Sequence, residues 1–214
     1  HMDGVIFAGE VDIRVIEEFR KQSIPVVLVN NYLDMDGLVC ISADHYGGAV
    51  QATEYLCKLG HCKIGLLSGR FSPQVSEARI EGFVKTLAKY DIPVDDRFIA
   101  DIEPALEDGE EIMTRMLREV DRPTAFFCTN DTIAAGAMKA VTRAGLRVPE
   151  DIAIIGFDDS YISRVVEPEL TTVRIDAAKM GCLAMQTLFD LIAGMPVEKA
   201  HIQIPTELIV RGTA

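Results

Sequence analysis

The sequence predicts an α/β fold built on parallel β-sheets. Short and nearly continuous apolar runs alternate with helical patterns along almost the whole chain. Runs such as IPVVLV and IAIIGF are typical of strands buried on both faces, which is how strands of parallel sheets lie. Alternation at this spacing indicates right-handed βαβ units and doubly wound sheets.

The expected strands are short apolar segments. They cover residues 5–8, 25–30, 38–42, 63–68, 98–102, 125–128 and 152–157. The C-terminal part breaks the alternation, because residues 170–176 form a strand leading into a helix and residues 202–211 form two short strands around Pro205.

Amphipathic helices are expected between these strands. The first is N-capped by Asp44 and runs to Leu59, with Gly60 as its stop. The inward stripes follow the helical period. They are Ala49, Ala52, Leu56 and Leu59; Ile80, Phe83, Val84, Leu87 and Tyr90; Ile112, Met113, Met116, Leu117 and Val120; Ile133, Ala137, Ala140 and Val141; and, in residues 177–193, Met180, Ala184, Leu188 and Leu191.

The charge and hydropathy of the chain narrow the class of protein. The chain carries 21 Lys and Arg against 33 Asp and Glu, a formal net charge of −12. A surface this acidic repels the phosphate backbone of nucleic acids, so this chain by itself is not expected to bind DNA or RNA. No run of about 18 apolar residues predicts a membrane span, and no signal peptide opens the chain.

The cysteines predict a reduced, cytoplasmic protein without a metal. They are odd in number and scattered, and no two of them form a CxxC pair. Cys57 and Cys62 flank His61, but zinc sites usually show tighter ligand pairs and a second pair elsewhere. We therefore expect no metal, and read His61 as a residue at the end of a helix.

Enzyme motifs are not found in the sequence. It contains no GxGxxG after a strand, no GxxxxGK[ST], no GxSxG and no HExxH. The segment LLSGRFS resembles a phosphate loop only weakly, since it has one glycine and no lysine. We therefore expect no enzyme activity and no cofactor.

Polar residues follow several predicted strands at the edge where open α/β sheets bind ligands. They are Asn30, Asn31, Arg79, Asn130, Asp131, Asp158 and Asp159. Planar Arg and Asp side chains with aromatic neighbours suit hydroxyl-rich small molecules. The alternative interpretations are structural: Asn130 and Asp131 cap a helix, Asp159 caps the next segment, and Arg79 pairs with a surface carboxylate.

Several longer sequence segments resemble those of a known protein family. They are DGVIFAG, IPVVLVN, ADHYGGAVQATEYLCKLGH, KIGLLSG, EARIEGF, PTAFFCTNDTIAAGAMKAVTRAGLRVPEDIAIIGFDD, PELTTVRIDAAKMG and ELIVR, and they span residues 3–211. With these phrases the chain closely resembles the effector-binding core of the lactose-repressor/galactose-repressor (LacI/GalR) family of bacterial transcription regulators.

The resemblance implies a periplasmic-binding-protein-like fold of type I, with two doubly wound parallel-sheet lobes and three crossovers near residues 42–43, 174–176 and 205–207. The partial N-terminal lobe would hold residues 3–42 and 177–204, and the C-terminal lobe residues 44–173 and 207–214. A small effector, usually a sugar or a nucleobase-like metabolite, would bind in the cleft and change operator affinity through a homodimer.

The family's effector contacts fall on matching residues of this chain. They are Asn30, Arg79 in EARIEGF, Asn130 in TND and Asp158 in GFDD, while Phe71 and Glu103 lie in loops that usually face the cleft. Arg79 also suits an acidic or phosphorylated sugar. Ile175 stands at a crossover position where some sugar-binding relatives have a polar residue.

The chain also departs from the family pattern. We expect an N-terminally truncated chain, because the helix-turn-helix, the hinge helix and two opening βα units of the family have no counterpart here. The first lobe would then be incomplete, with an unpaired edge around residues 5–7, and operator DNA would be bound only through the missing helix-turn-helix. The alternatives are a solute-binding protein of a sugar uptake system, which shares the fold, and an enzyme on the same fold.

Overall fold

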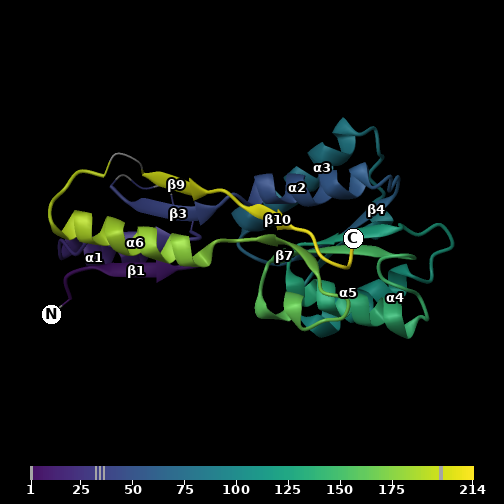
Figure 1. Cartoon of the computed structure of the whole chain (residues 1–214). Helices are drawn as coiled ribbons and strands as arrows, with labels where there is room; N and C mark the ends of the chain where they lie inside the picture. Colours follow the sequence, from purple (N-terminus) through teal and green to yellow (C-terminus); the bar gives the residue numbers. More distant parts are fainter. Residues whose placement is uncertain (1, 32, 34, 36, 198–199) are drawn as a thin grey trace. The chain divides into compact units, whose positions relative to one another are not determined.

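A computed structural model describes residues 2–31, 33, 35, 37–197 and 200–214. The chain divides into two compact units. Unit 1 comprises His1–Asp44 and Asp176–Pro205, and unit 2 comprises His45–Ile175 and Thr206–Ala214. The chain therefore passes from one unit to the other three times, as a periplasmic-binding-protein-like fold requires (Figure 1).

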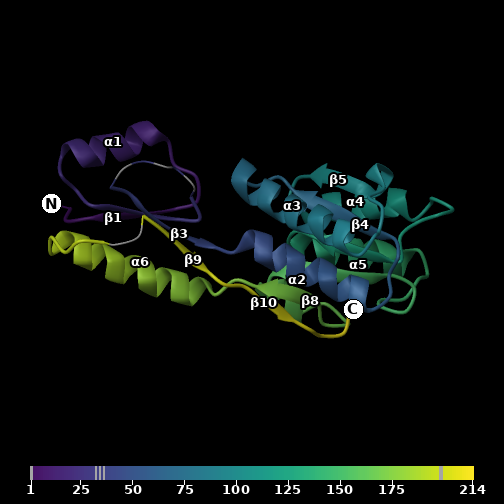
Figure 2. The same ribbon diagram turned by 90° about the horizontal axis from the view of Figure 1, so that it is seen from above.

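Unit 1 is a parallel sheet with a helix on each face. In the described residues the strand order is β1-β2-β3-β9, and every pairing is parallel. The strands are β1 (Val5–Ala8), β2 (Val26–Val29), β3 (Val39–Ala43) and β9 (His201–Ile204). The helices are α1 (Ile13–Lys21) and α6 (Ala177–Ile192), and Figure 2 shows them on opposite sides of the sheet.

Side chains alternate along β2, so each of the two helices has an apolar face of the sheet to pack against. Val26 and Leu28 pack in one cluster with Ile16 of α1. Because successive side chains of a strand point to opposite faces, Val27 is left for the α6 side, and it is fully buried. β1 is an edge strand of this sheet and pairs with β2.

Unit 2 is a larger sheet of order β10-β8-β7-β6-β4-β5 among the described residues. Its strands are β4 (Ile64–Gly69), β5 (Ile99–Ile102), β6 (Ala125–Cys128), β7 (Ala153–Asp158), β8 (Thr171–Arg174) and β10 (Glu207–Ile209). Its helices are α2 (His45–Lys58), α3 (Pro73–Lys89), α4 (Leu106–Met116) and α5 (Asp131–Arg143), with short 3₁₀ turns η1 (Asp96–Phe98) and η2 (Tyr161–Arg164).

The two faces of this sheet bury separate clusters. Ala125 and Phe127 of β6 lie in the cluster under α2 and α3, whereas Phe126 and Cys128 lie in the cluster under α4 and α5. Figure 1 shows the two helix pairs on opposite sides of the strands. Continuous apolar runs are therefore needed in β6, as the sequence pattern predicts.

One strand of unit 2 departs from the predicted parallel sheet. β10 pairs with β8 in antiparallel fashion, with Glu207 opposite Arg174. β8 ends just before the chain leaves unit 2 after Ile175, and β10 begins just after the chain returns at Thr206. Because β10 enters unit 2 at the end of the sheet where β8 leaves it, the two strands run in opposite directions.

All five predicted helices are present, as α2 to α6, and two of the predicted stripes are wrong at their ends. Leu59 is 50% exposed and Val120 is fully exposed, although both are predicted to face inward. Leu59 follows the last residue of α2 and precedes Gly60, whose φ of +91° turns the chain. α4 already ends at Met116, so Val120 does not lie on its stripe.

No helix is predicted from the sequence between residues 9 and 24, but the structure forms α1 there. Asp12 caps it, because its side chain accepts a hydrogen bond from the backbone N–H of Arg14. Ile16 is its one buried residue, and with nine residues the helix is shorter than the window over which a helical period is read. Among the described residues, no helix combines the length and apolar character that a membrane span needs.

Candidate functional site

The candidate site lies in unit 2 at the carboxyl ends of parallel strands. Asp158 is the last residue of β7, Thr129 follows β6, and Phe71 lies between β4 and α3. Arg79 comes from the second turn of α3, which begins at Pro73. Strand ends of one parallel sheet meet at one edge, so these side chains come together from distant parts of the sequence.

Arg79 is the centre of the site. Its side chain is only 3% exposed. One terminal nitrogen, Nη1, donates a hydrogen bond to the backbone carbonyl of Thr129. The other, Nη2, lies 3.3 Å from Oδ1 of Asp158 and 3.2 Å from Nδ1 of His45. Arg79 is therefore held in one orientation. Its carboxylate partner Asp158 is partly exposed, so the alternative in which Arg79 only pairs with a surface carboxylate stays open.

Two aromatic rings also contact the guanidinium of Arg79 and help to fix its orientation. The guanidinium carbon of Arg79 lies 3.9 Å from the ring centroid of Phe157 and 4.9 Å from that of Phe71. A planar guanidinium is attracted to the negative face of an aromatic ring. α2 comes close to Phe157 at Gly48, where an added Cβ would lie 2.7 Å from Cζ of the ring.

The surroundings change the protonation of two neighbours of Arg79. Burial, together with the charge of Arg79, lowers the pKa of His45 to about 3. His45 is therefore neutral at physiological pH and can accept a hydrogen bond. Burial raises the pKa of Asp158 to about 6, although the Arg79 guanidinium acts in the opposite direction. Asp158 is thus mainly ionised at neutral pH and faces a cation.

Asn130 is engaged in a structural role. It is the N-cap of α5, and its Oδ1 accepts a hydrogen bond of 2.8 Å from the backbone N–H of Ile133. The side chain of the next residue, Asp131, accepts bonds from the backbone N–H of Ser160 and the hydroxyl of Thr172, and burial raises its pKa. The capping interpretation of Asn130 is confirmed by this geometry, which leaves its contact with an effector a prediction.

The remaining predicted site residues lie apart from Arg79 in the contacts described. Glu103 follows β5 and accepts a hydrogen bond of 3.0 Å from Arg70. Asn30 belongs to unit 1, where its Oδ1 accepts a bond from the backbone N–H of Ala43. Its φ of +51° lies in the left-handed region that Asn tolerates better than most residues.

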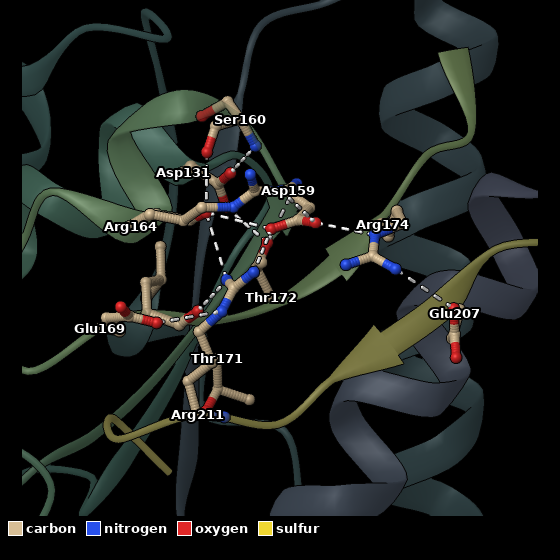
Figure 3. A network of polar contacts seen from close by, with 12 residues as sticks. Asp131, Asp159, Ser160, Arg164, Glu169, Thr171, Thr172, Arg174, Glu207 and Arg211 are labelled. Atoms are coloured by element: carbon tan, nitrogen blue, oxygen red, sulfur yellow. Dashed lines mark hydrogen bonds and ion pairs between the residues drawn. The ribbon is translucent and has the colours of Figure 1, made fainter. Parts of the chain in front are cut away.

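Asp159 forms a separate network beside the site (Figure 3). Its side chain is 2% exposed and makes ion pairs with Arg211, Arg174 and Arg164. The interpretation of Asp159 as a simple cap of the following segment is therefore too narrow, because its partners also come from β8 and from the C-terminal segment.

His45 and Thr129 are contacts of Arg79 that the sequence argument did not select. His45 is the first residue of α2 and lies two residues after the end of β3, so its place shortly after a strand end is a usable signal. Thr129 contributes through its backbone carbonyl, for which a side-chain pattern carries no signal. Among the described residues, no group of His, Cys, Asp and Glu is arranged to hold a metal ion.

The arrangement can bind hydroxyl-rich molecules. A fixed guanidinium offers donors and an ionised carboxylate offers acceptors, so together they can engage neighbouring hydroxyl groups. The side chain of Asp158 is 36% exposed, so it can be reached by a ligand. The adjoining ring of Phe71 adds an apolar surface beside these polar groups.

Comparisons with known proteins give the family. Residues 53–214 match the family described as "Periplasmic binding protein-like domain". The "Probable HTH-type transcriptional repressor ExuR" of Bacillus subtilis is 35% identical over 211 residues, which are 98% of this chain and 63% of that protein. The chain thus spans less than two thirds of the length of this relative.

Solved structures agree with this match. A regulatory protein of the LacI family from Chloroflexus aggregans is 31% identical with a TM-score of 0.90, covering 99% of this chain and 76% of that one. A LacI family regulator from Enterococcus faecium, solved with bound ribose, is 27% identical with a TM-score of 0.89, covering 99% and 79%. The chain therefore belongs to the LacI family of transcription regulators, of which it covers the periplasmic-binding-protein-like effector-binding core.

Proposed function

We propose that this chain is the ligand-sensing part of a transcription regulator and that it binds a sugar or sugar derivative through Arg79 and Asp158. The observation that carries the proposal is the contact between these two residues. A buried, oriented guanidinium faces a partly exposed carboxylate at the ligand-binding edge of the sheet. The ribose bound to the Enterococcus faecium regulator supports a sugar as the class of ligand.

The charges of the site bear on which sugars fit. Arg79 can donate to hydroxyl groups or to a carboxylate. Asp158 accepts from hydroxyl groups when it is ionised, and it repels an anion placed directly against it. We therefore propose a neutral sugar or a sugar acid whose hydroxyl groups face Asp158 and whose acidic group, if present, faces Arg79.

Further contacts are proposed on the family resemblance. Phe71 would pack against the sugar ring, which its position beside Arg79 supports. Asn130, Asn30 and Glu103 would each contribute a polar contact. Glu103 would do so from the loop after β5.

The output of ligand binding would be a change in operator affinity. We propose that the protein works in the cytoplasm as a homodimer and contacts operator DNA through a helix-turn-helix segment outside residues 1–214. The net charge of −12 supports a separate DNA-binding segment, because the acidic effector-binding core itself repels DNA. No step of this scheme requires catalysis or a cofactor.

A thermal-shift panel tests the proposal. The protein is mixed separately with ribose, glucose, glucuronate and hypoxanthine, and each hit is confirmed by calorimetry. A ligand that binds only the native state at a hundred times its Kd stabilises it by about 2.7 kcal/mol. We expect stabilisation by at least one sugar or sugar acid. A shift with hypoxanthine alone would overturn the sugar assignment.

A further inference from the structure

The backbone at the end of β7 adopts a strained conformation that surrounding contacts have to maintain. Asp158 has a φ of +107° and Asp159 a φ of +51°. Positive φ is uncommon for residues with a side chain and persists where the surrounding structure imposes it. The φ of Asp159 lies in the left-handed region that Asp and Asn tolerate, while that of Asp158 lies well outside it. The carboxylate that faces Arg79 is therefore carried by strained backbone.

Asp159 anchors this backbone through its side chain. Its Oδ1 lies 2.5 Å from Nη2 of Arg211, and its Oδ2 lies 2.8 Å from Nε of Arg174 and 3.3 Å from Nη2 of Arg164. Oδ1 also accepts a hydrogen bond of 3.1 Å from the hydroxyl of Ser163. Figure 3 shows the three arginines around this carboxylate: Arg164 comes from η2, Arg174 from β8 and Arg211 from the C-terminal segment.

The charge of Asp159 is stable in this setting. Burial alone would raise the pKa of Asp159, but the hydrogen bonds and charges of Arg211 and Arg174 outweigh it and hold the pKa at about 2. The anchor is therefore ionised throughout the physiological range. A buried carboxylate surrounded by cations loses much of its hold if the charge is removed.

The backbone amides on this segment are held as well. The N–H of Asp159 donates to the hydroxyl of Thr172 at 3.4 Å, and the N–H of Ser160 donates to Oδ2 of Asp131 at 2.6 Å. The hydroxyl of Thr172 in turn donates to Oδ1 of Asp131 at 2.5 Å. Residues 159 and 160 are thus fixed by side chains of α5 and β8 in addition to the arginines.

We infer that Asp159 is a positioning residue, which holds the strained backbone of Asp158 so that the carboxylate of Asp158 faces Arg79. The side chain of Asp158 is partly exposed and has a single ion-pair contact of 3.3 Å with Arg79, so its own packing fixes it less firmly than the network fixes Asp159. This inference rests on the proposed function, in which the two residues bind the effector.

The test is a carboxyl titration of the ligand-free protein, followed by ¹³C NMR on labelled aspartate. The variant is Asp159→Asn. Asn also tolerates the left-handed region, so this change removes the charge with little direct effect on the backbone preference. The matched control is Glu169→Gln, which removes another carboxylate partner of Arg211, at 3.5 Å, on a side chain that is 57% exposed.

We expect the pKa of Asp158 to be raised in the unchanged protein and in Glu169→Gln, and to fall by at least one unit in Asp159→Asn as the carboxylate turns further into solvent. An unchanged raised pKa of Asp158 in folded Asp159→Asn overturns the inference. If Asp159→Asn does not fold, Arg174→Gln takes its place, because it keeps the carboxylate and removes one cation. A pKa of Asp158 unaltered in that folded variant likewise overturns it.

This titration uses no sugar, so it separates two failures. If the pKa of Asp158 falls in Asp159→Asn but no sugar binds the unchanged protein, the positioning role stands and the proposed function fails. If sugars bind but the pKa does not respond, the proposed function stands and Asp159 serves the stability of the fold alone.

Discussion

Nη2 of Arg79 lies 3.3 Å from Oδ1 of Asp158, and this contact joins α3 to the end of β7. The two partners differ in exposure, with 3% for the side chain of Arg79 and 36% for that of Asp158. The cation is thus fixed by the protein while the anion remains accessible. A ligand that engages Asp158 therefore meets a guanidinium that is already oriented.

The first prediction concerns the dependence of stability on pH. The pKa of Asp158 is raised to about 6 in the folded protein, above the ordinary value of 3.8. The folded state then holds this proton more tightly than the unfolded state, so the contribution to stability is full below about pH 4 and is lost as the pH rises through 6. Urea unfolding at pH 4.5 and pH 7 should show this loss in the unchanged protein and not in Asp158→Asn. Identical pH dependence in both proteins would contradict the assigned shift.

A second prediction concerns His45 as an acceptor for Arg79. His45→Leu removes the acceptor 3.2 Å from Nη2 and should weaken sugar binding, by about 10-fold if the bond is worth roughly 1.5 kcal/mol. His45→Asn places an oxygen where Nδ1 stands and should restore most of the affinity. Calorimetry on the two variants checks this, and equal losses in both would show that the acceptor is not what matters.

The third prediction separates capping from ligand contact at Asn130. Asn130→Ala removes the cap of α5 and should cost about 1 kcal/mol of unfolding free energy. Asn130→Asp keeps a capping oxygen and should keep the stability. Sugar affinity in folded Asn130→Asp then reports on ligand contact alone. A stability of Asn130→Ala equal to that of the unchanged protein would argue that the cap contributes little.

Close packing of α4 and α5 supplies the fourth prediction. An added Cβ at Gly136 would lie 2.1 Å from the backbone oxygen of Leu106, so Gly136→Ala should destabilise the protein by about 1–3 kcal/mol despite a better helix propensity. Gly181 in α6 has no atom within 4 Å of an added Cβ, and Gly181→Ala should stabilise by about 0.5–1 kcal/mol. Thermal unfolding of both measures the contrast. A stabilised Gly136→Ala would mean that the helices can separate at small cost.

Much of the fold follows from local patterns in the sequence. The run of β6 alternates between two buried clusters, so a continuous apolar segment was enough to predict a strand covered on both faces. The helix end at Gly60 is predictable from the sequence, because glycine adopts without strain the positive φ, here +91°, at which helices commonly stop.

Other features depend on tertiary structure that no local pattern records. The direction of β10 is set by where the chain re-enters unit 2, and the periodicity of residues 207–209 is the same for either direction. The apolar and charged residues of α1 are well separated, but its nine residues are fewer than the roughly 11–18 over which a helical period is read, so the sequence pattern does not predict this helix.

The candidate site shows the same limit. The position of polar residues after strands selected Arg79 and Asp158, which the structure brings together. It also selected Asp159, whose ion pairs with Arg174 and Arg211 join residues far apart in the sequence. Strand ends predict which residues reach the edge of a sheet, but they do not predict which of them face a ligand and which hold one another.

The measurement that tests the central claim most directly is calorimetric binding of the most stabilising sugar of the panel to Asp158→Asn. Asp151→Asn is the matched control, because Asp151 also pairs with an arginine, Arg147 at 2.9 Å, and its side chain is 32% exposed. We predict an affinity at least about 10-fold weaker in Asp158→Asn, since hydrogen bonds to charged groups are worth about 1.5–3 kcal/mol, and no change in Asp151→Asn. Equal affinity in the unchanged protein and both variants would contradict the assignment of Asp158 to the binding site.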